Sequence, residues 1–111
     1  MKIYSEIATV ISNKKIADNI YETFLLSPQI SQSSHPGQFI NILPSYDWNN
    51  VMRRPMSIAL QSDDTISIIY KVFGAGTQLM SEWEKNDKVD IIGPLGNQWF
   101  DYEDKYPILI G

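Results

Sequence analysis

The stretch MSIALQSDDTISIIYKV, residues 56–72, decides the fold class of this 111-residue chain. Two short runs rich in apolar residues, Met56 to Leu60 and Thr65 to Val72, flank the turn cluster Gln61-Ser62-Asp63-Asp64. Apolar runs of this length on both sides of a turn are typical of a β-hairpin. The stretch therefore predicts two antiparallel strands joined by a tight turn.

The same alternation of short apolar runs and turn residues continues on both sides of the hairpin. The other strand candidates are Ile3 to Ile11, Ile20 to Leu26, Gln38 to Leu43 and Lys88 to Ile92. They are separated by a turn at Ser12 to Lys15, a polar loop at Ser27 to Pro36, an irregular loop from Pro44 to Met52 that carries Trp48, and a helical segment that reaches Glu84.

That helical segment is short. Leu79 and Trp83 lie four residues apart, which places them on one helix face, and Thr77 is a good N-cap candidate. The sequence therefore predicts an all-β fold, a six-stranded antiparallel Greek-key barrel with one short helix, because closure removes the exposed edges that an open sheet would leave.

The bulk composition limits the class of partner. The formal net charge is -4, so the surface should repel nucleic acid and anionic lipid, and no long apolar run predicts a membrane span. The chain has no cysteine, which excludes disulfides and thiolate metal sites and favours the cytoplasm. We expect one domain over residues 1–111, cut off within a strand at Pro107 to Gly111, whose apolar side chains need a sheet to cover them.

Arg53-Arg54-Pro55-Met56-Ser57 is the sharpest local signal, because it holds both arginines of the chain. An arginine fork binds phosphate in a bidentate manner, and Pro55 extends the backbone at Arg54. Two surface arginines that only increase solubility are an equally good explanation of the pentapeptide alone.

Gly74-Ala75-Gly76-Thr77 offers a second place for an anion, since glycines allow close approach and a helix start presents free N–H groups. An ordinary strand-to-helix turn is the alternative. On the strand before it, the backbone at Ile69, Tyr70 and Lys71 could bind the polar edge of a flat heterocycle, although core packing is the better single explanation of the Ile69 and Tyr70 side chains.

Other constellations predict no catalytic residue and no metal site. His35 is the only histidine and lies in a polar loop, and the acidic group Asp101, Glu103 and Asp104 is typical of a solvated loop.

Taken in order, Arg54-Pro55-Met56-Ser57, Ile69-Tyr70-Lys71, Gly76-Thr77 and Gly93-Pro94-Leu95-Gly96-Asn97 resemble the FAD-binding domain of the ferredoxin-NADP reductase superfamily. Within it, the doubled arginine, the tract IIYKVFGAGT and the turn GPLGN resemble most the electron-transfer subunit of the two-subunit, NAD-linked dihydroorotate dehydrogenase of pyrimidine biosynthesis.

The resemblance implies a barrel that binds FAD, with Arg54, Gly76 and Thr77 at the diphosphate, Ser57 near the reactive flavin edge, and Ile69 to Lys71 at the pyrimidine side. Pro55 and Met56 belong to the same motif. It further implies an NAD-binding α/β domain after PILIG, a [2Fe-2S] segment, and an FMN-bearing catalytic partner subunit in a heterotetramer. The 111-residue chain alone would hold FAD at most and would be inactive as an enzyme.

The sequence departs from the family at Met56, where a tyrosine is frequent, at Lys71, where an arginine is frequent, and at Gln98 and Trp99, where glycine and phenylalanine are frequent. Two alternatives to the dihydroorotate dehydrogenase subunit stay open. One is a reductase subunit for another acceptor, such as sulfite or an oxygenase; the other is a non-enzymatic β-barrel that binds an acidic partner through Arg53 and Arg54.

Overall fold

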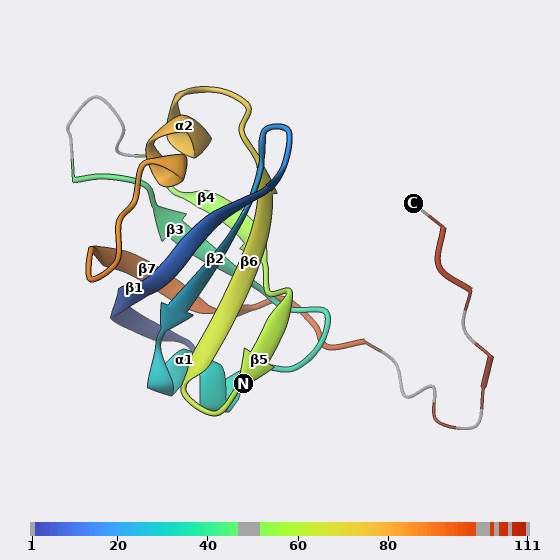
Figure 1. Ribbon diagram of the computed structural model, residues 1–111. Coiled ribbons are helices and arrows are strands. Elements are labelled where there is room, and N and C mark those ends of the chain that lie inside the picture. Colours follow the sequence, from blue (N-terminus) through green and yellow to red (C-terminus); the bar gives the residue numbers. More distant parts are fainter. Residues whose placement is uncertain (1, 47–51, 100–102, 104, 107, 111) are drawn as a thin grey trace.

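The computed structural model describes residues 2–46, 52–99, 103, 105–106 and 108–110 (Figure 1). In this part of the chain it has seven strands and two short helices. In chain order they are β1 (Tyr4–Ala17), β2 (Ile20–Leu26), α1 (Pro28–Ser33), β3 (Phe39–Leu43), β4 (Arg54–Ser57), β5 (Leu60–Ser62), β6 (Thr65–Lys71), α2 (Ala75–Ser81) and β7 (Lys88–Leu95).

All the strands join one antiparallel sheet in the order β4-β3-β7-β1-β2-β6-β5. The sheet curls into a half-barrel, with α2 at one end and α1 at the other (Figure 1). The predicted all-β antiparallel barrel is therefore confirmed. It has one more strand and one more helix than the apolar runs indicated.

The extra strand arises because the predicted run Met56 to Leu60 divides in two. β4 pairs with β3, whereas β5 pairs with β6 across the turn at Asp63 and Asp64. Between the two strands, the Ile58 N–H donates to the Gln38 carbonyl at 3.1 Å and the Ala59 N–H donates to the Ser67 carbonyl at 2.8 Å. Residues 54–62 thus run without interruption from one edge of the sheet to the other.

The first hairpin is longer than expected, and the turn predicted at Ser12 to Lys15 is wrong. β1 continues to Ala17, and the chain reverses at Asp18 and Asn19, where Asn19 has a φ of 58°. This part of the hairpin projects beyond the core, so the strand there needs no buried apolar face and can contain Lys14 and Lys15. These polar residues were therefore mistaken for a turn.

The helix α1 lies in the predicted polar loop, and it forms through contacts distant in sequence. Pro28 occupies its first turn and Ile30 is fully buried. The carboxylate of Glu6 on β1 accepts hydrogen bonds from the Ser27 hydroxyl and from the backbone N–H groups of Gln29 and Ile30, the last two at 3.2 Å. A cap supplied by another strand leaves no local signal in the sequence.

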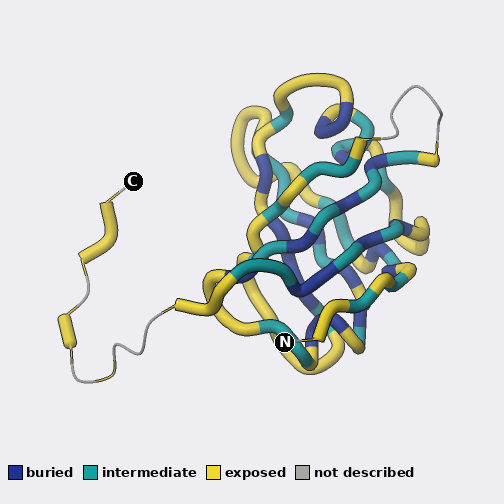
Figure 2. Tube along the Cα trace, turned by 180° about the vertical axis from the view of Figure 1, so that it is seen from behind, coloured by how far each residue is buried: buried dark blue, intermediate teal, exposed yellow. Residues whose placement is uncertain are grey.

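The core is one cluster of buried apolar residues, which lie among the dark segments in Figure 2. Alternate residues of the strands supply most of it, as the period of two requires, and each helix adds one residue. Its members are Ala8, Val10, Leu25, Ile30, Ile40, Ile42, Ile66, Ile68, Tyr70, Met80, Val89 and Ile91.

Two expectations near the C-terminus are wrong. Gly93, Pro94 and Leu95 belong to β7 instead of a turn; Pro94 fits because the register shifts beside it, between Phe39 and Asn41, so the ladder needs no N–H from it. Ile108, Leu109 and Ile110 form no strand and are exposed, since no described strand pairs with them.

Pro107 and Gly111 lie outside the described residues, as does Trp48. Within the described ranges, neither helix is long and apolar enough to cross a membrane.

Candidate functional site

Arg54 opens β4 and packs directly on the first turn of α2. A β-carbon at Gly76 would lie 2.5 Å from Nε of Arg54 and 2.8 Å from its Cζ and Nη2. No side chain larger than that of glycine fits there without moving the guanidinium. The structure therefore brings together the arginine and the glycine that the sequence placed at one anion site, although they are 22 positions apart.

The two adjacent arginines have different surroundings. Nη2 of Arg53 forms an ion pair with Oδ1 of Asp90 at 2.9 Å, and its Nη1 donates to the carbonyls of Asn41 and Asp90 at 3.4 and 3.3 Å. Nη1 of Arg54 donates to the Met52 carbonyl at 2.6 Å, and no carboxylate among the described residues pairs with it. The guanidinium of Arg53 is thus neutralised by Asp90 and held by strand carbonyls. The guanidinium of Arg54 has no such acidic partner among the described residues, so its charge is available to an anion.

The start of α2 differs from the prediction, and Thr77 is not its N-cap. The N-cap is Gly74, with a φ of 95°, and the helix begins at Ala75. The Thr77 hydroxyl instead accepts a hydrogen bond from the Phe73 N–H at 2.6 Å and fixes the turn that leads into the helix. The first-turn amides of an α-helix have no acceptor within the helix, so those of Ala75, Gly76 and Thr77 point out of its start.

The strand β6 carries the next predicted group, and its three residues separate by face. Tyr70 is buried, stacks on Tyr21 at 6.0 Å between ring centroids, and donates its hydroxyl to Oδ1 of Asn13. Core packing is therefore the explanation for the Tyr70 side chain. Ile69 is 48% exposed, so core packing does not explain it, and Lys71 is exposed as well.

The backbone of Ile69 and Lys71 faces an open edge of the sheet. In an antiparallel ladder, successive residues direct their N–H and C=O groups to opposite sides. The carbonyl of Ser67 faces the β5 side, and Val72 donates to Asn19 on the β2 side. The backbone N–H and C=O groups of Ile69 and Lys71 therefore point away from β2. They lie past Ser67, the last residue of β6 that pairs with β5. Their backbone groups can bind a polar ligand.

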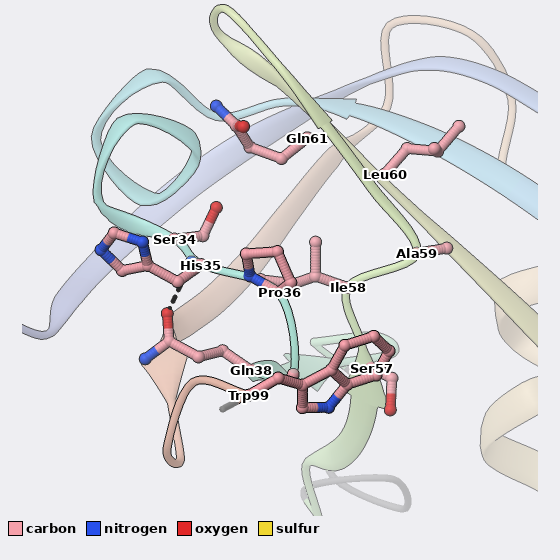
Figure 3. A pocket seen from close by; sticks show the side chains of 11 residues that line it. Ser34, His35, Pro36, Gln38, Ser57, Ile58, Ala59, Leu60, Gln61 and Trp99 are labelled. Carbon is pink, nitrogen blue, oxygen red and sulfur yellow. Dashed lines mark hydrogen bonds between the residues drawn. The ribbon is translucent and has the colours of Figure 1, made fainter. Parts of the chain in front are cut away.

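Along β4, the side chains alternate between the core and the outside. Met56 packs against the core cluster, whereas Pro55 and Ser57 are exposed. Ser57 also borders a cavity of about 330 Å³ between residues 34–38 and 57–61, which Trp99 helps to line (Figure 3). Of the predicted site residues only Ser57 lines this cavity, so the cavity adjoins the site at the end of β4 that is opposite to Arg54.

Sequence reasoning missed Phe73. Its side chain is 86% exposed, and its backbone is fixed by Thr77 and flanked by Gly74. The sequence held a clue to Phe73, because an aromatic residue in the connection between a strand and a helix is not required for core packing. An exposed ring on a fixed backbone beside an anion site can stack on a planar heterocycle.

His35 lies in the loop that lines the cavity. Among the described residues, no three histidine or acidic residues gather closely enough to hold a metal ion. Asp101 and Asp104 of the acidic group lie outside the described residues.

No protein-family model matches the chain. Over 91 residues, 80% of the chain, it is 40% identical to the dihydroorotate dehydrogenase B (NAD(+)), electron transfer subunit, of Bacillus pumilus strain SAFR-032, and it covers 35% of that protein. The subunit of the same name from Enterococcus faecalis strain V583 is 36% identical over 100 residues, which are 87% of the chain and 37% of the relative. The chain thus spans about a third of the length of these curated relatives.

Solved structures share the fold. A structure of an NADH-dependent reduced ferredoxin-NADP oxidoreductase superposes with a TM-score of 0.78 and 26% identity, over 86% of the chain and 34% of that protein. The cytochrome P450 reductase GcoB of Amycolatopsis has a TM-score of 0.71 and 22% identity, over 86% of the chain and 29% of that protein. The predicted resemblance to this superfamily, and within it to the electron-transfer subunit, is confirmed.

Proposed function

We propose that this chain, whose homologues are electron transfer subunits of dihydroorotate dehydrogenase B, binds FAD as part of such a subunit and relays electrons between a dihydroorotate dehydrogenase partner and NAD. The observation that carries the proposal is the contact of Arg54 with Gly76, which places a guanidinium and a helix start where one diphosphate can bind both.

Two parts of the candidate site would hold FAD. Arg54 and the amides of Gly76 and Thr77 would bind the diphosphate, because the missing β-carbon at Gly76 lets the guanidinium pack against the helix start. The open backbone edge at Ile69 and Lys71 would bind the pyrimidine side of the flavin. FAD would supply the electron chemistry, while the protein binds and orients it.

Ser57 would lie near the reactive edge of the flavin, at the other end of β4 from Arg54, and Pro55 and Met56 would set the path of the strand between them. Met56 stands where a tyrosine is frequent and packs against the core, so this position would supply no aromatic ring to cover the flavin. The exposed ring of Phe73 would stack on the adenine at the far end of the cofactor.

In this proposal, the chain is part of a longer protein that also has an NAD-binding domain and a [2Fe-2S] segment. That protein would form a heterotetramer with an FMN-bearing catalytic subunit in the cytoplasm. The chain has no cysteine and so offers no thiolate ligands to an iron–sulfur cluster. A reductase subunit for another acceptor is the second candidate, because the P450 reductase has the same fold.

Titration of the purified 111-residue chain with FAD tests the proposal. We expect a perturbed flavin absorbance spectrum, changed flavin fluorescence and saturable binding. FMN lacks the adenosine and one phosphate, so it should bind more weakly than FAD. A chain that binds neither flavin would contradict the proposal, and equal affinity for both would remove Phe73 from the site.

A further inference from the structure

Asn13 joins α2 to the sheet through a side chain that uses its full hydrogen-bonding capacity. Its Nδ2 donates to the carbonyls of Met80 at 2.9 Å and Trp83 at 3.1 Å. Its Oδ1 accepts from the Thr23 hydroxyl at 2.7 Å and the Tyr70 hydroxyl at 3.2 Å. A side-chain amide has two donor hydrogens and two acceptor lone pairs, so all four are engaged.

The two sides of the amide hold different elements. The nitrogen side binds the Met80 carbonyl in the last turn of α2 and the Trp83 carbonyl just after the helix, in addition to the backbone N–H groups that Met80 already accepts. The oxygen side binds β2 and β6. Asn13 is therefore a helix cap that is supplied from β1, at a separation of 67 residues from Met80.

Both elements lead to the candidate site. α2 carries Gly76 and Thr77 at its start, and Tyr70 lies between Ile69 and Lys71 on β6. The Trp83 indole also donates to the Pro44 carbonyl at 3.2 Å, which ties the region after α2 to the loop that follows β3. Asn13 thus connects the C-terminal end of α2 to β6 through one side chain on β1, whereas the start of α2 is held by the hydrogen bond from the Phe73 N–H to the Thr77 hydroxyl.

We propose that Asn13 is a positioning residue that sets the place of α2 relative to β6, and so the distance between the diphosphate site and the flavin-ring site. The inference rests on the proposed function. An α2 released from Asn13 moves its first-turn amides relative to Arg54 while the open edge of β6 stays in place.

Asn13→Asp separates the two sides of the amide. The aspartate keeps oxygen acceptors for Thr23 and Tyr70, but it loses both N–H donors and turns a carboxylate towards two carbonyls. Thr23→Val is the matched control, because it removes a contact on the sheet side and leaves the contacts to α2 intact.

The measurement is the affinity for FAD and for riboflavin, which has the ring system and no phosphate. In Asn13→Asp we expect FAD affinity to fall about tenfold, the equivalent of one lost hydrogen bond to the diphosphate, and riboflavin affinity to stay within about twofold. Thr23→Val should keep the wild-type ratio of the two affinities, whatever its melting temperature.

Equal losses for FAD and riboflavin in Asn13→Asp, or an unchanged FAD affinity, would overturn the inference and leave the proposed function standing. Wild-type protein that binds neither ligand would overturn both. If Asn13→Asp does not fold, Asn13→Ser keeps one donor and should show a smaller loss that is again selective for FAD; an unchanged ratio would decide against the inference.

Discussion

The guanidinium of Arg54 lies against the backbone of Gly76, at the distance where an added β-carbon would sit 2.5 Å from Nε. The contact joins the first residue of β4 to the first turn of α2. Neither element alone makes an anion site, because isolated surface arginines and short helices are both common. Their contact combines a full positive charge with free backbone amides.

Gly76→Ala tests this contact. The new methyl group should displace the Arg54 side chain, which is flexible, and lower FAD affinity by about tenfold. Folding stability should be unchanged or should rise by up to about 1 kcal/mol, because alanine favours a helix. Flavin titration and urea unfolding give the two quantities. Gln78→Ala, on the exposed side of α2, is the control and should leave affinity unchanged. A fully active binding site in Gly76→Ala would contradict the assignment.

Arg54→Ala and Arg53→Ala should have opposite profiles. We expect Arg54→Ala to weaken FAD binding by about 1.5–3 kcal/mol, the range for hydrogen bonds to charged groups, with little change in stability. Arg53→Ala leaves the half-buried Asp90 without its partner and should lower stability by about 1–3 kcal/mol. Calorimetric titration and chemical denaturation of both variants measure this contrast. The same loss of affinity in both would mean that the two arginines act alike.

Glu6→Ala should destabilise the fold without affecting flavin affinity. It removes the carboxylate that receives the N–H groups at the start of α1, and the loss of such a cap costs about 1–2 kcal/mol. Glu84→Ala is the control, since that side chain is exposed and the described hydrogen bonds of Glu84 involve only its backbone. Thermal unfolding of the two variants should differ, and equal midpoints would show that the cap contributes nothing.

The protein should lose stability in strong alkali through Tyr70. Burial raises the pKa of the Tyr70 hydroxyl above its ordinary value of 10.0, and the neighbouring Tyr21 raises it further, against the opposing hydrogen bonds to Thr23 and Asn13. The folded state therefore holds the proton more tightly than the unfolded state. This contribution is complete below about pH 10 and is lost as the pH rises through the folded-state pKa.

Urea unfolding at about pH 8 and above about pH 10 measures this loss. Tyr70→Phe has no proton to lose at this position, so its stability should fall less over the same interval. An identical fall in both proteins would assign the alkaline loss to other groups.

The sequence predicted the fold class because the core strands alternate regularly. Ile20–Leu26 matches β2 in full, and the core residues Ile66 and Ile68 follow the period of two. Where prediction failed, a distant contact decided the structure. α1 depends on Glu6, and the division of the Met56 to Leu60 run depends on which neighbour each half pairs with.

The sequence indicated which residues of the candidate site lie together, while their binding of an anion stays a prediction. A doubled arginine and a pair of glycines indicated an anion site, and their contact is present. The division of roles between Arg53 and Arg54 was not predictable, because it depends on Asp90, which lies on a strand that pairs with β3. Thr77 was misassigned because its hydroxyl bonds back to Phe73 instead of capping the helix.

Ile58 and Ala59 join β4 to β5, so the two free margins of the half-barrel converge at one end and separate at the other. One short segment therefore closes the sheet on itself at the Ser57 end of β4, while the Arg54 end lies against α2. In the proposed complex, this path would set the direction of FAD, with the diphosphate at Arg54 and the flavin ring towards Ser57.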